Sequence, residues 1–144
     1  MPAMPASRLE DEAACARLCI DFANHLDARR YERVLGLFTE DAALDRMGNV
    51  SQGRAEIARF LAGRPVQTTT RHVCSNIRVS FEGEPEGEAG GVCYVLFFQG
   101  ADDADGGAPR LSGPPSVVEY HDRFRRTPDG WKIHSRRICM AIRA

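Results

Sequence analysis

Two side chains in this sequence could carry proton-transfer chemistry, the carboxylate of Asp27 and the imidazole of His72. Asp27 lies four residues after Ala23 and seven after Ile20, so it continues the apolar stripe of a helix predicted to begin at Ser7. A carboxylate on that inward stripe needs a polar partner. Imidazole is the side chain best matched to proton transfer near neutral pH, so His72 is the candidate base.

His72 belongs to a predicted strand at residues 68–82, in which it alternates with Cys74 and Asn76. The opposite parity is apolar and carries Val73, Ile77 and Val79. The face with His72 is therefore semi-polar, as the wall of a ligand cavity would be. We expect Cys74 and Asn76 to contact a ligand there.

Tyr120 and Asp122 share one face of another predicted strand, at residues 115–127, and both are expected to line the same pocket. Each has a structural alternative. Tyr120 could be a core aromatic residue whose hydroxyl finds a partner. Asp122 could accept an ion pair from Arg136 or Arg137 across the last hairpin.

Composition excludes several other kinds of function. The 144 residues have a net charge of -1 and scattered arginines, which does not fit nucleic acid or an anionic membrane as partner. No apolar run is long enough to span a membrane and the N-terminus lacks the apolar centre of a secretion signal, so we expect a cytoplasmic protein. The five cysteines form no Cys-x-x-Cys pair and the histidines no metal-binding pair, so we expect reduced thiols and no metal.

The pattern of elements predicts one α+β domain at residues 7–144 after a flexible tail at residues 1–6. Helices are expected near residues 7–26, 30–38 and 54–61, and short strands near 43–46 and 50–52. Long strands are expected at residues 68–82, 91–100, 115–127 and 130–142, with a tight turn at Thr127–Gly130 and a mobile connection at 101–114. Helices packed on one face of a curved sheet would leave a pocket between the two layers.

Ordered landmarks along the chain resemble the SnoaL-like branch of the nuclear-transport-factor-2-like (NTF2-like) superfamily, in particular its scytalone-dehydratase-like and dehydrochlorinase-like members. They are Leu26-Asp27, Leu37-Phe38 with Asp41-Ala42, Gly53 to Ile57 with Phe60, Thr70 to Val73 with Asn76, Tyr120-x-Asp122-x-Phe124, and Asp129 to Ile133 with Arg136-Arg137. The resemblance implies a cone-shaped fold, in which three N-terminal helices pack on a strongly curved, mainly antiparallel sheet that encloses a cavity. Because the superfamily includes enzymes and proteins that only bind, the fold alone does not decide function.

The resemblance also implies roles for particular residues. In the dehydratase-like and dehydrochlorinase-like members an Asp at the position of Asp27 orients a His at the position of His72, and no cofactor takes part. Arg136 matches an arginine near the leaving group, although strand parity groups it with solvated residues. Phe22 occupies the position where those enzymes place a Lys or Tyr that assists the reaction, and a hydrocarbon cannot do so.

Three hypotheses for function follow. The first is a cofactor-independent lyase or isomerase of the dehydratase kind that acts on a small apolar, cyclic or aromatic substrate, with His72 as base, Asp27 as its orienter and Tyr120 or Arg136 as electrophilic helper. The second is a module that only binds a hydrophobic ligand, which Phe22 favours, with Asp27 as a helix cap and His72 as a half-buried histidine. The third is an oligomerisation module. A homodimer or homotrimer is expected because residues 92–98 are apolar at both parities.

Overall fold

The computed structural model describes residues 6–103 and 105–143. Three helices and two strands precede the longer strands. The order is α1 (Ala6–Asp27), α2 (Tyr31–Gly36), β1 (Phe38–Arg46), β2 (Asn49–Gln52), α3 (Gly53–Ala62), β3 (Thr68–Ser80), β4 (Glu88–Ala101), β5 (Arg110–Leu111), β6 (Ser116–Thr127) and β7 (Gly130–Ile142). Ala6 begins α1, and the rest of the predicted tail lies outside the described residues.

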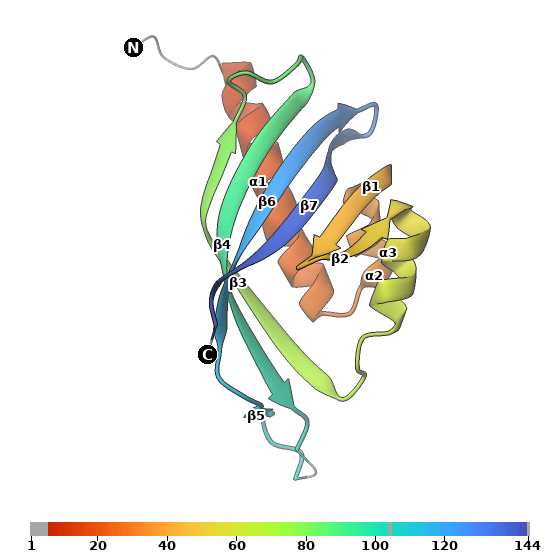
Figure 1. Cartoon of the computed structure of the whole chain (residues 1–144), viewed down its shortest axis with the longest axis vertical. Coiled ribbons are helices and arrows are strands. Elements are labelled where there is room, and N and C mark those ends of the chain that lie inside the picture. The colour runs from red at the N-terminus through yellow and green to blue at the C-terminus, as the bar shows by residue number, and fades with distance from the viewer. Residues whose placement is uncertain (1–5, 104, 144) are drawn as a thin grey trace.

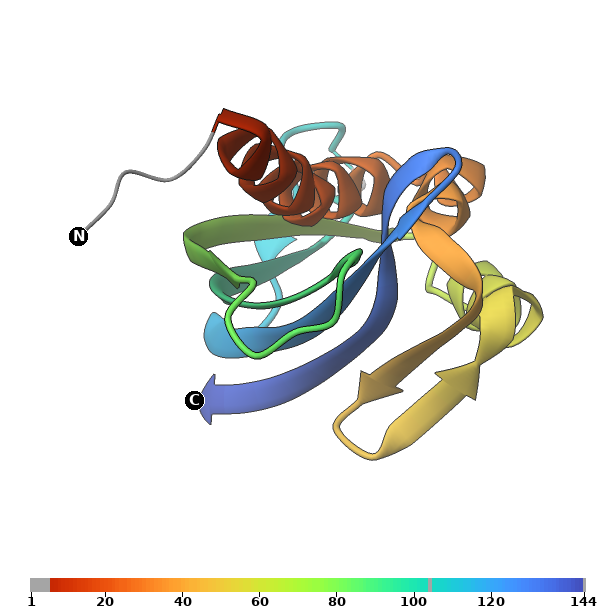
Figure 2. The ribbon, with the colours of Figure 1, turned by 90° about the horizontal axis from the view of Figure 1, so that it is seen from above.

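The strands form one sheet in the order β2-β1-β7-β6-β4-β3, with β5 paired to β4. The β1–β7 pair is parallel and the others are antiparallel. Figures 1 and 2 show that the sheet curves and that α1 lies across its concave side, with α2 and α3 beside the β1–β2 hairpin. The predicted α+β architecture, with three helices on a curved and mainly antiparallel sheet, is confirmed.

The buried face of α1 differs from the stripe predicted from its sequence. Ile20, at the centre of that stripe, is 47% exposed, and Leu9 is exposed as well. The buried residues are mainly the adjoining row, Cys15, Leu18, Cys19, Phe22, Ala23 and Leu26. Both rows are apolar, so only packing against the sheet decides which of them faces inward. No helix within the described residues is long and apolar enough to span a membrane.

The chain enters the sheet earlier than the sequence predicts. The second helix ends at Gly36 and β1 begins at Phe38, whereas a helix was predicted up to residue 38 and a strand only from residue 43. Phe38 pairs with Ile133 of β7, so a distant strand extends β1. The predicted turn at Thr127–Gly130 is confirmed, with the Thr127 hydroxyl donating to the Gly130 carbonyl over 2.8 Å.

An irregularity in β3 reverses which side chains face inward. The register with β4 shifts between Ser75 and Arg78, and Asn76 between them has a φ of 51°. Such a bulge inserts a residue and interrupts the alternation of faces. Asn76 is consequently exposed, whereas Ile77 packs against the core. The prediction that Asn76 shares the face of His72 was wrong.

A second irregularity, in β7, has the opposite consequence for Arg136. Phe124 pairs with Ile133 and Arg123 with Ser135, which leaves His134 as the extra residue. Beyond it the parity reverses, so Arg136 is only 1% exposed. The prediction that Arg136 lies on a solvated face with His134 was therefore wrong.

Candidate functional site

A cavity of about 390 Å³ opens between the helices and the concave face of the sheet. Its wall is mostly aliphatic and aromatic, and consists of Phe22, Leu26, Leu44, Arg46, Met47, Asn49, Phe60, Arg64, His72, Phe97, Ser116, Val118, Tyr120, Ile138 and Met140. Largely apolar hollows with a few polar groups are typical of small-molecule sites. Two of the predicted catalytic residues, His72 and Tyr120, line it, as does Phe22.

Asp27 and His72 are in direct contact at the edge of this cavity. The His72 Nδ1–H donates to Asp27 Oδ1 over 2.6 Å, and the His72 backbone N–H donates to Oδ2 over 2.8 Å. The side chains of His72 and Asp27 are only 9% and 11% exposed. The carboxylate thus holds both the ring and the backbone of the same residue.

This contact sets the tautomer of the ring. With Nδ1–H directed at Asp27, Nε2 is the nitrogen that can accept a proton. Burial works to raise the pKa of Asp27, but the hydrogen bonds from His72 and Thr70 outweigh it and hold that pKa below its usual value. Asp27 therefore stays ionised beside His72 at neutral pH.

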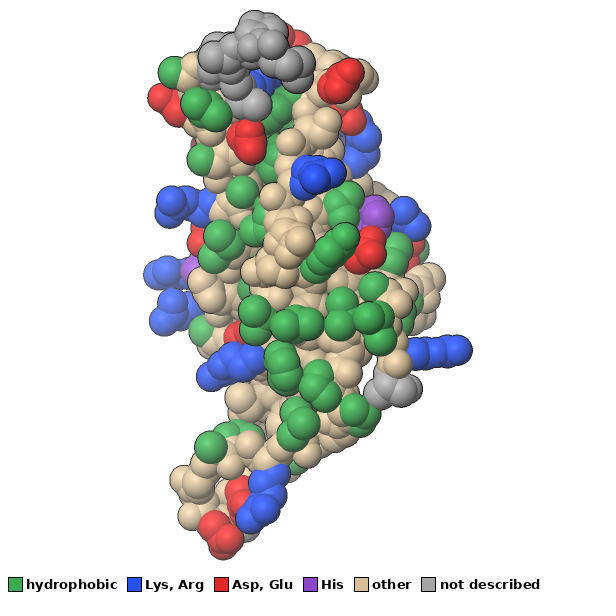
Figure 3. Space-filling view, turned by 90° about the vertical axis from the view of Figure 1, so that its left-hand side faces the viewer, with side chains coloured by type: hydrophobic (Ala, Val, Ile, Leu, Met, Phe, Trp, Pro, Cys, Tyr) green, Lys and Arg blue, Asp and Glu red, His purple; other side chains and the backbone are tan. Residues whose placement is uncertain are grey.

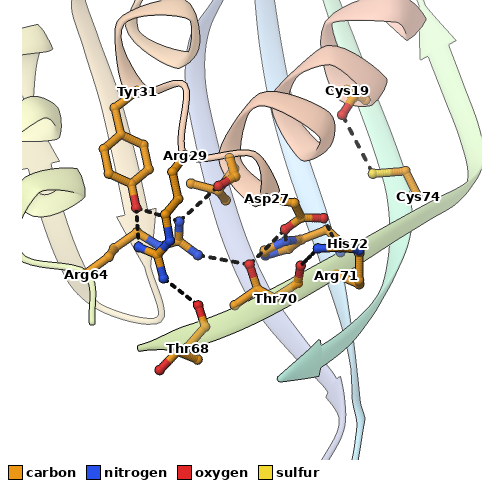
Figure 4. A network of polar contacts seen from close by, with 11 residues as sticks. Cys19, Asp27, Arg29, Tyr31, Arg64, Thr68, Thr70, Arg71, His72 and Cys74 are labelled. Carbon is orange, nitrogen blue, oxygen red and sulfur yellow. Dashed lines mark hydrogen bonds and ion pairs between the residues drawn. The ribbon is translucent and has the colours of Figure 1, made fainter. Parts of the chain in front are cut away.

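A network of side chains fixes Asp27 where α1 ends (Figure 4). The Thr70 hydroxyl donates to Asp27 Oδ1 over 2.8 Å and accepts from Arg64 over 3.2 Å. Arg64 also donates to the Leu26 carbonyl and to the Tyr31 hydroxyl. The end of α1 is thereby tied to β3 through Thr70.

Asp27 does not cap α2. The N-cap residue of that helix is Arg30, and no side chain there makes a capping hydrogen bond. The side-chain hydrogen bonds of Asp27 come from Thr70 and His72, both on β3. The structural alternative for Asp27 therefore does not apply.

Phe22 and Tyr120 lie next to each other in the wall of the cavity. Their rings meet edge to face with centroids 5.9 Å apart. Burial raises the pKa of Tyr120, so its hydroxyl stays protonated and can act only as a neutral hydrogen-bond donor or acceptor. The His72 ring lies 4.9 Å from that of Phe97, its register partner on β4.

Arg136 packs against the rings of Phe22 and Tyr120 in the core and is not among the residues that line the cavity. Its guanidinium carbon is 4.4 Å from the Phe22 ring and 4.3 Å from the Tyr120 ring. Its Nε and Nη2 each donate to Asp122 over 2.8 Å, in a bidentate pair. The expected ion pair of Asp122 with one of the two arginines is thus formed with Arg136, and Asp122 is absent from the cavity wall as well.

The other two predicted ligand contacts also lie away from the cavity wall. Cys74 faces α1, where its thiol is 3.7 Å from the Cys19 carbonyl (Figure 4). Asn76 is exposed at the bulge. All five cysteines are free thiols.

Sequence reasoning singled out few residues of the wall, and three that it missed bear on its chemistry. Arg46 and Arg64 carry charge into the cavity, and Phe97 packs on His72. Phe97 could have been inferred, since it lies in an apolar run that pairs with β3. The two arginines carry no local signal that separates them from surface arginines. Within the described residues, His, Cys, Asp and Glu form no group of three or more that could hold a metal ion.

Comparisons with known proteins agree with this architecture. A family model for the SnoaL-like domain matches residues 7–137. An uncharacterized protein of Mycobacterium tuberculosis is 26% identical over 137 residues, which cover 90% of this chain and 85% of that protein. Its activity is not indicated by its name.

Solved structures of the same shape include an NTF2-like protein with a cystatin-like fold from Novosphingobium aromaticivorans, with a TM-score of 0.77, 22% identity and coverage of 96% of this chain and 86% of that one. A candidate scytalone dehydratase from the same organism matches with a TM-score of 0.80 and 24% identity, over 96% of this chain and 89% of that one. A type 2 hexachlorocyclohexane dehydrochlorinase (LinA) matches with a TM-score of 0.78 and 20% identity, over 94% of this chain and 88% of that one. The predicted NTF2-like fold is therefore confirmed.

Proposed function

The chain belongs to the SnoaL-like domain family, and we propose that within it the protein is a cofactor-independent lyase or isomerase that acts on a small, largely apolar, ring-containing substrate. The observation that carries this proposal is the Asp27–His72 contact at the edge of the apolar cavity. The dehydratase and dehydrochlorinase among proteins of the same fold support the reaction class.

The reaction begins when His72 Nε2 removes a proton next to a carbonyl or a leaving group. Asp27 stabilises the imidazolium that results and keeps the ring in the orientation in which Nε2 is free. The Tyr120 hydroxyl, which stays protonated, donates a hydrogen bond to the oxygen on which negative charge develops. In the lyase reaction the bond to the leaving group then breaks and that group departs with the bonding electron pair, whereas in the isomerase reaction the His72 imidazolium returns the proton to another carbon.

Proton abstraction can be tested without the natural substrate. We expect the protein to accelerate exchange of the α-protons of α-tetralone, a bicyclic ketone, for deuterium in D₂O, followed by NMR. Replacing His72 by Gln should lower the protein-dependent exchange by about 10²- to 10⁴-fold, because a positioned general base contributes that much. The matched control is His121→Gln, since His121 is paired with Glu119 and is not part of the cavity wall.

The same experiment distinguishes the alternative function, a module that binds a hydrophobic ligand without turnover. Phe22 favours this alternative because it contributes an apolar ring to the cavity wall where the enzymes of this kind have a Lys or Tyr that assists the reaction. Saturable binding of α-tetralone that His72→Gln leaves unchanged, with no exchange above the buffer rate, would support the module and contradict the enzyme proposal.

We also propose that a second copy of this chain binds the outer face of the sheet. Val73, Leu96 and Val117 are register partners across β3, β4 and β6, and Val117 pairs in turn with Ile142 of β7. Val73 is 47% and Leu96 39% exposed. Figure 3 shows hydrophobic side chains gathered on the side of the sheet away from α1. A continuous apolar row of this kind is typical of an interface.

Light scattering coupled to size exclusion tests this interface. We expect the wild-type protein to elute as a dimer or trimer and the Leu96→Glu variant as a monomer, because a charge in the middle of an apolar contact must be desolvated on association. The control is Glu82→Lys, which changes the charge of the exposed segment after β3. A monomeric wild-type protein would contradict the proposal.

A further inference from the structure

We propose that the substrate carries an anionic oxygen group, most simply a carboxylate, and that Arg46 binds it. This inference rests on the proposed function in one respect only, namely that the cavity beside His72 is the substrate site. It names a class of substrate, aromatic or alicyclic carboxylates, and a residue that selects for it.

The first observation is that Arg46 has a cationic group with unused donors. It is the last residue of β1 and lines the cavity. Its guanidinium carbon lies 3.6 Å from the Phe60 ring centroid. Its Nε is buried without a hydrogen-bond partner, and its Nη2 makes only a long contact of 3.4 Å to the Ser51 hydroxyl. A buried donor left unpaired is costly, and an anion would remove that cost.

The second observation is the imbalance of charge in the cavity wall. The wall contains two arginines and His72 but no aspartate or glutamate. Arg64 is already occupied, because it donates to the Leu26 carbonyl, the Tyr31 hydroxyl and the Thr70 hydroxyl. Asp27 is likewise occupied by Thr70 and His72. Neither arginine of the wall pairs with a carboxylate among the described residues, but Arg64 has its donors engaged, whereas those of Arg46 are left largely unpaired.

Other arginines of this protein show what a structural role looks like. Arg123, Arg125 and Arg126 each pair with a carboxylate, at 2.5, 3.4 and 2.5 Å respectively. Arg136 pairs with Asp122 in the core. Arg46 also lies over an aromatic ring, as Arg136 does, but it lines an apolar hollow and pairs with no carboxylate of the described residues.

The position of Arg46 also suits a ligand with one charged end. Met47 and Asn49, next to it at the β1–β2 turn, line the cavity and are exposed, so this side is its mouth. A carboxylate can pair with Arg46 there while its ring enters between Phe22 and Phe97. Bidentate pairing of guanidinium and carboxylate supplies geometric selection as well as affinity.

Binding of two nearly isosteric probes tests the inference. We expect 2-naphthoate to bind at least about tenfold more tightly than its neutral analogue 2-naphthamide, as measured by isothermal titration calorimetry, because a hydrogen bond to a charged group is worth more than a neutral one. In Arg46→Met, which keeps an apolar stem over Phe60, the naphthoate preference should disappear while naphthamide binding is retained. The matched control is Arg59→Met, which removes one charge from the exposed side of α3 and should keep the preference.

Three results would overturn the inference. They are equal affinity of the wild-type protein for the two probes, loss of the preference in Arg59→Met as well as Arg46→Met, and no saturable binding of naphthoate. Because the readout is binding, it is independent of turnover. A carboxylate preference in a protein that exchanges no protons would leave Arg46 as an anion-binding residue and contradict only the catalytic proposal.

Discussion

Two carboxylates of this protein each bind a nitrogen-containing partner, and their surroundings differ. Asp27 holds His72 at the edge of the cavity, where the second ring nitrogen remains free. Asp122 holds Arg136 in the core, beneath the rings of Phe22 and Tyr120. The first pair leaves a group that can exchange a proton, and the second leaves none.

The comparison explains why burial alone does not identify a reactive site. Burial works to lower the pKa of Arg136, but the charge of Asp122 more than offsets it, so the pKa is raised and the guanidinium stays charged. At Asp27 the pKa is lowered instead, and the carboxylate can serve as a fixed negative charge beside a titratable ring. Access to a ligand and a partner with a free ring nitrogen distinguish the Asp27 pair from the Asp122 pair.

The largest effect on stability is expected from breaking the core pair. Arg136→Met should reduce the free energy of unfolding by about 3–5 kcal/mol, because it leaves the Asp122 carboxylate buried without its counterion. Urea denaturation followed by circular dichroism measures this loss. The double variant Asp122→Leu, Arg136→Met removes both charges and should recover at least half of it. A double variant as unstable as the single one would mean that packing under Phe22 and Tyr120, and not charge, is what Arg136 provides.

A smaller effect that depends on pH is expected at the cavity pair. Asp27→Asn should reduce the free energy of unfolding by about 2 kcal/mol at neutral pH, through weaker hydrogen bonds to His72 and Thr70. The pKa of Asp27 is lower in the folded chain than in the unfolded one, whose value is about 3.9. The stability from this carboxylate is therefore complete above the unfolded value and is lost as pH falls through the folded one.

The difference in stability between wild type and Asp27→Asn should accordingly shrink on acidification below about pH 4. Urea denaturation at a series of pH values measures it. Asp21→Asn, on the same helix and with a side chain that makes no hydrogen bond or ion pair within the described residues, should show no such change. A difference that stays constant down to the acid limit would show that the carboxyl of Asp27 is not stabilised in its charged form.

Much of the architecture could be predicted from local patterns. Periodicity located the three helices and the long strands, and Thr127–Gly130 was identified as a turn because its residue types match that geometry. The contact of Asp27 with His72 was implied by resemblance and could not be derived from spacing, since the two residues are 45 positions apart. The assignment of the α1 face failed at Ile20 because two adjoining rows of that helix are equally apolar.

The sequence by itself determined the order of elements, because hydrophobic period and turn chemistry act over a few residues. Only the tertiary structure decided which side chains reach the cavity. A bulge at Asn76 turns that residue outward, and another at His134 turns Arg136 into the core. Each bulge arises from pairing with a neighbouring strand and reverses every later side chain, so alternation read from the sequence alone cannot locate it. The free charge of Arg46 beside an acid-free wall is likewise a property of residues brought together from several elements.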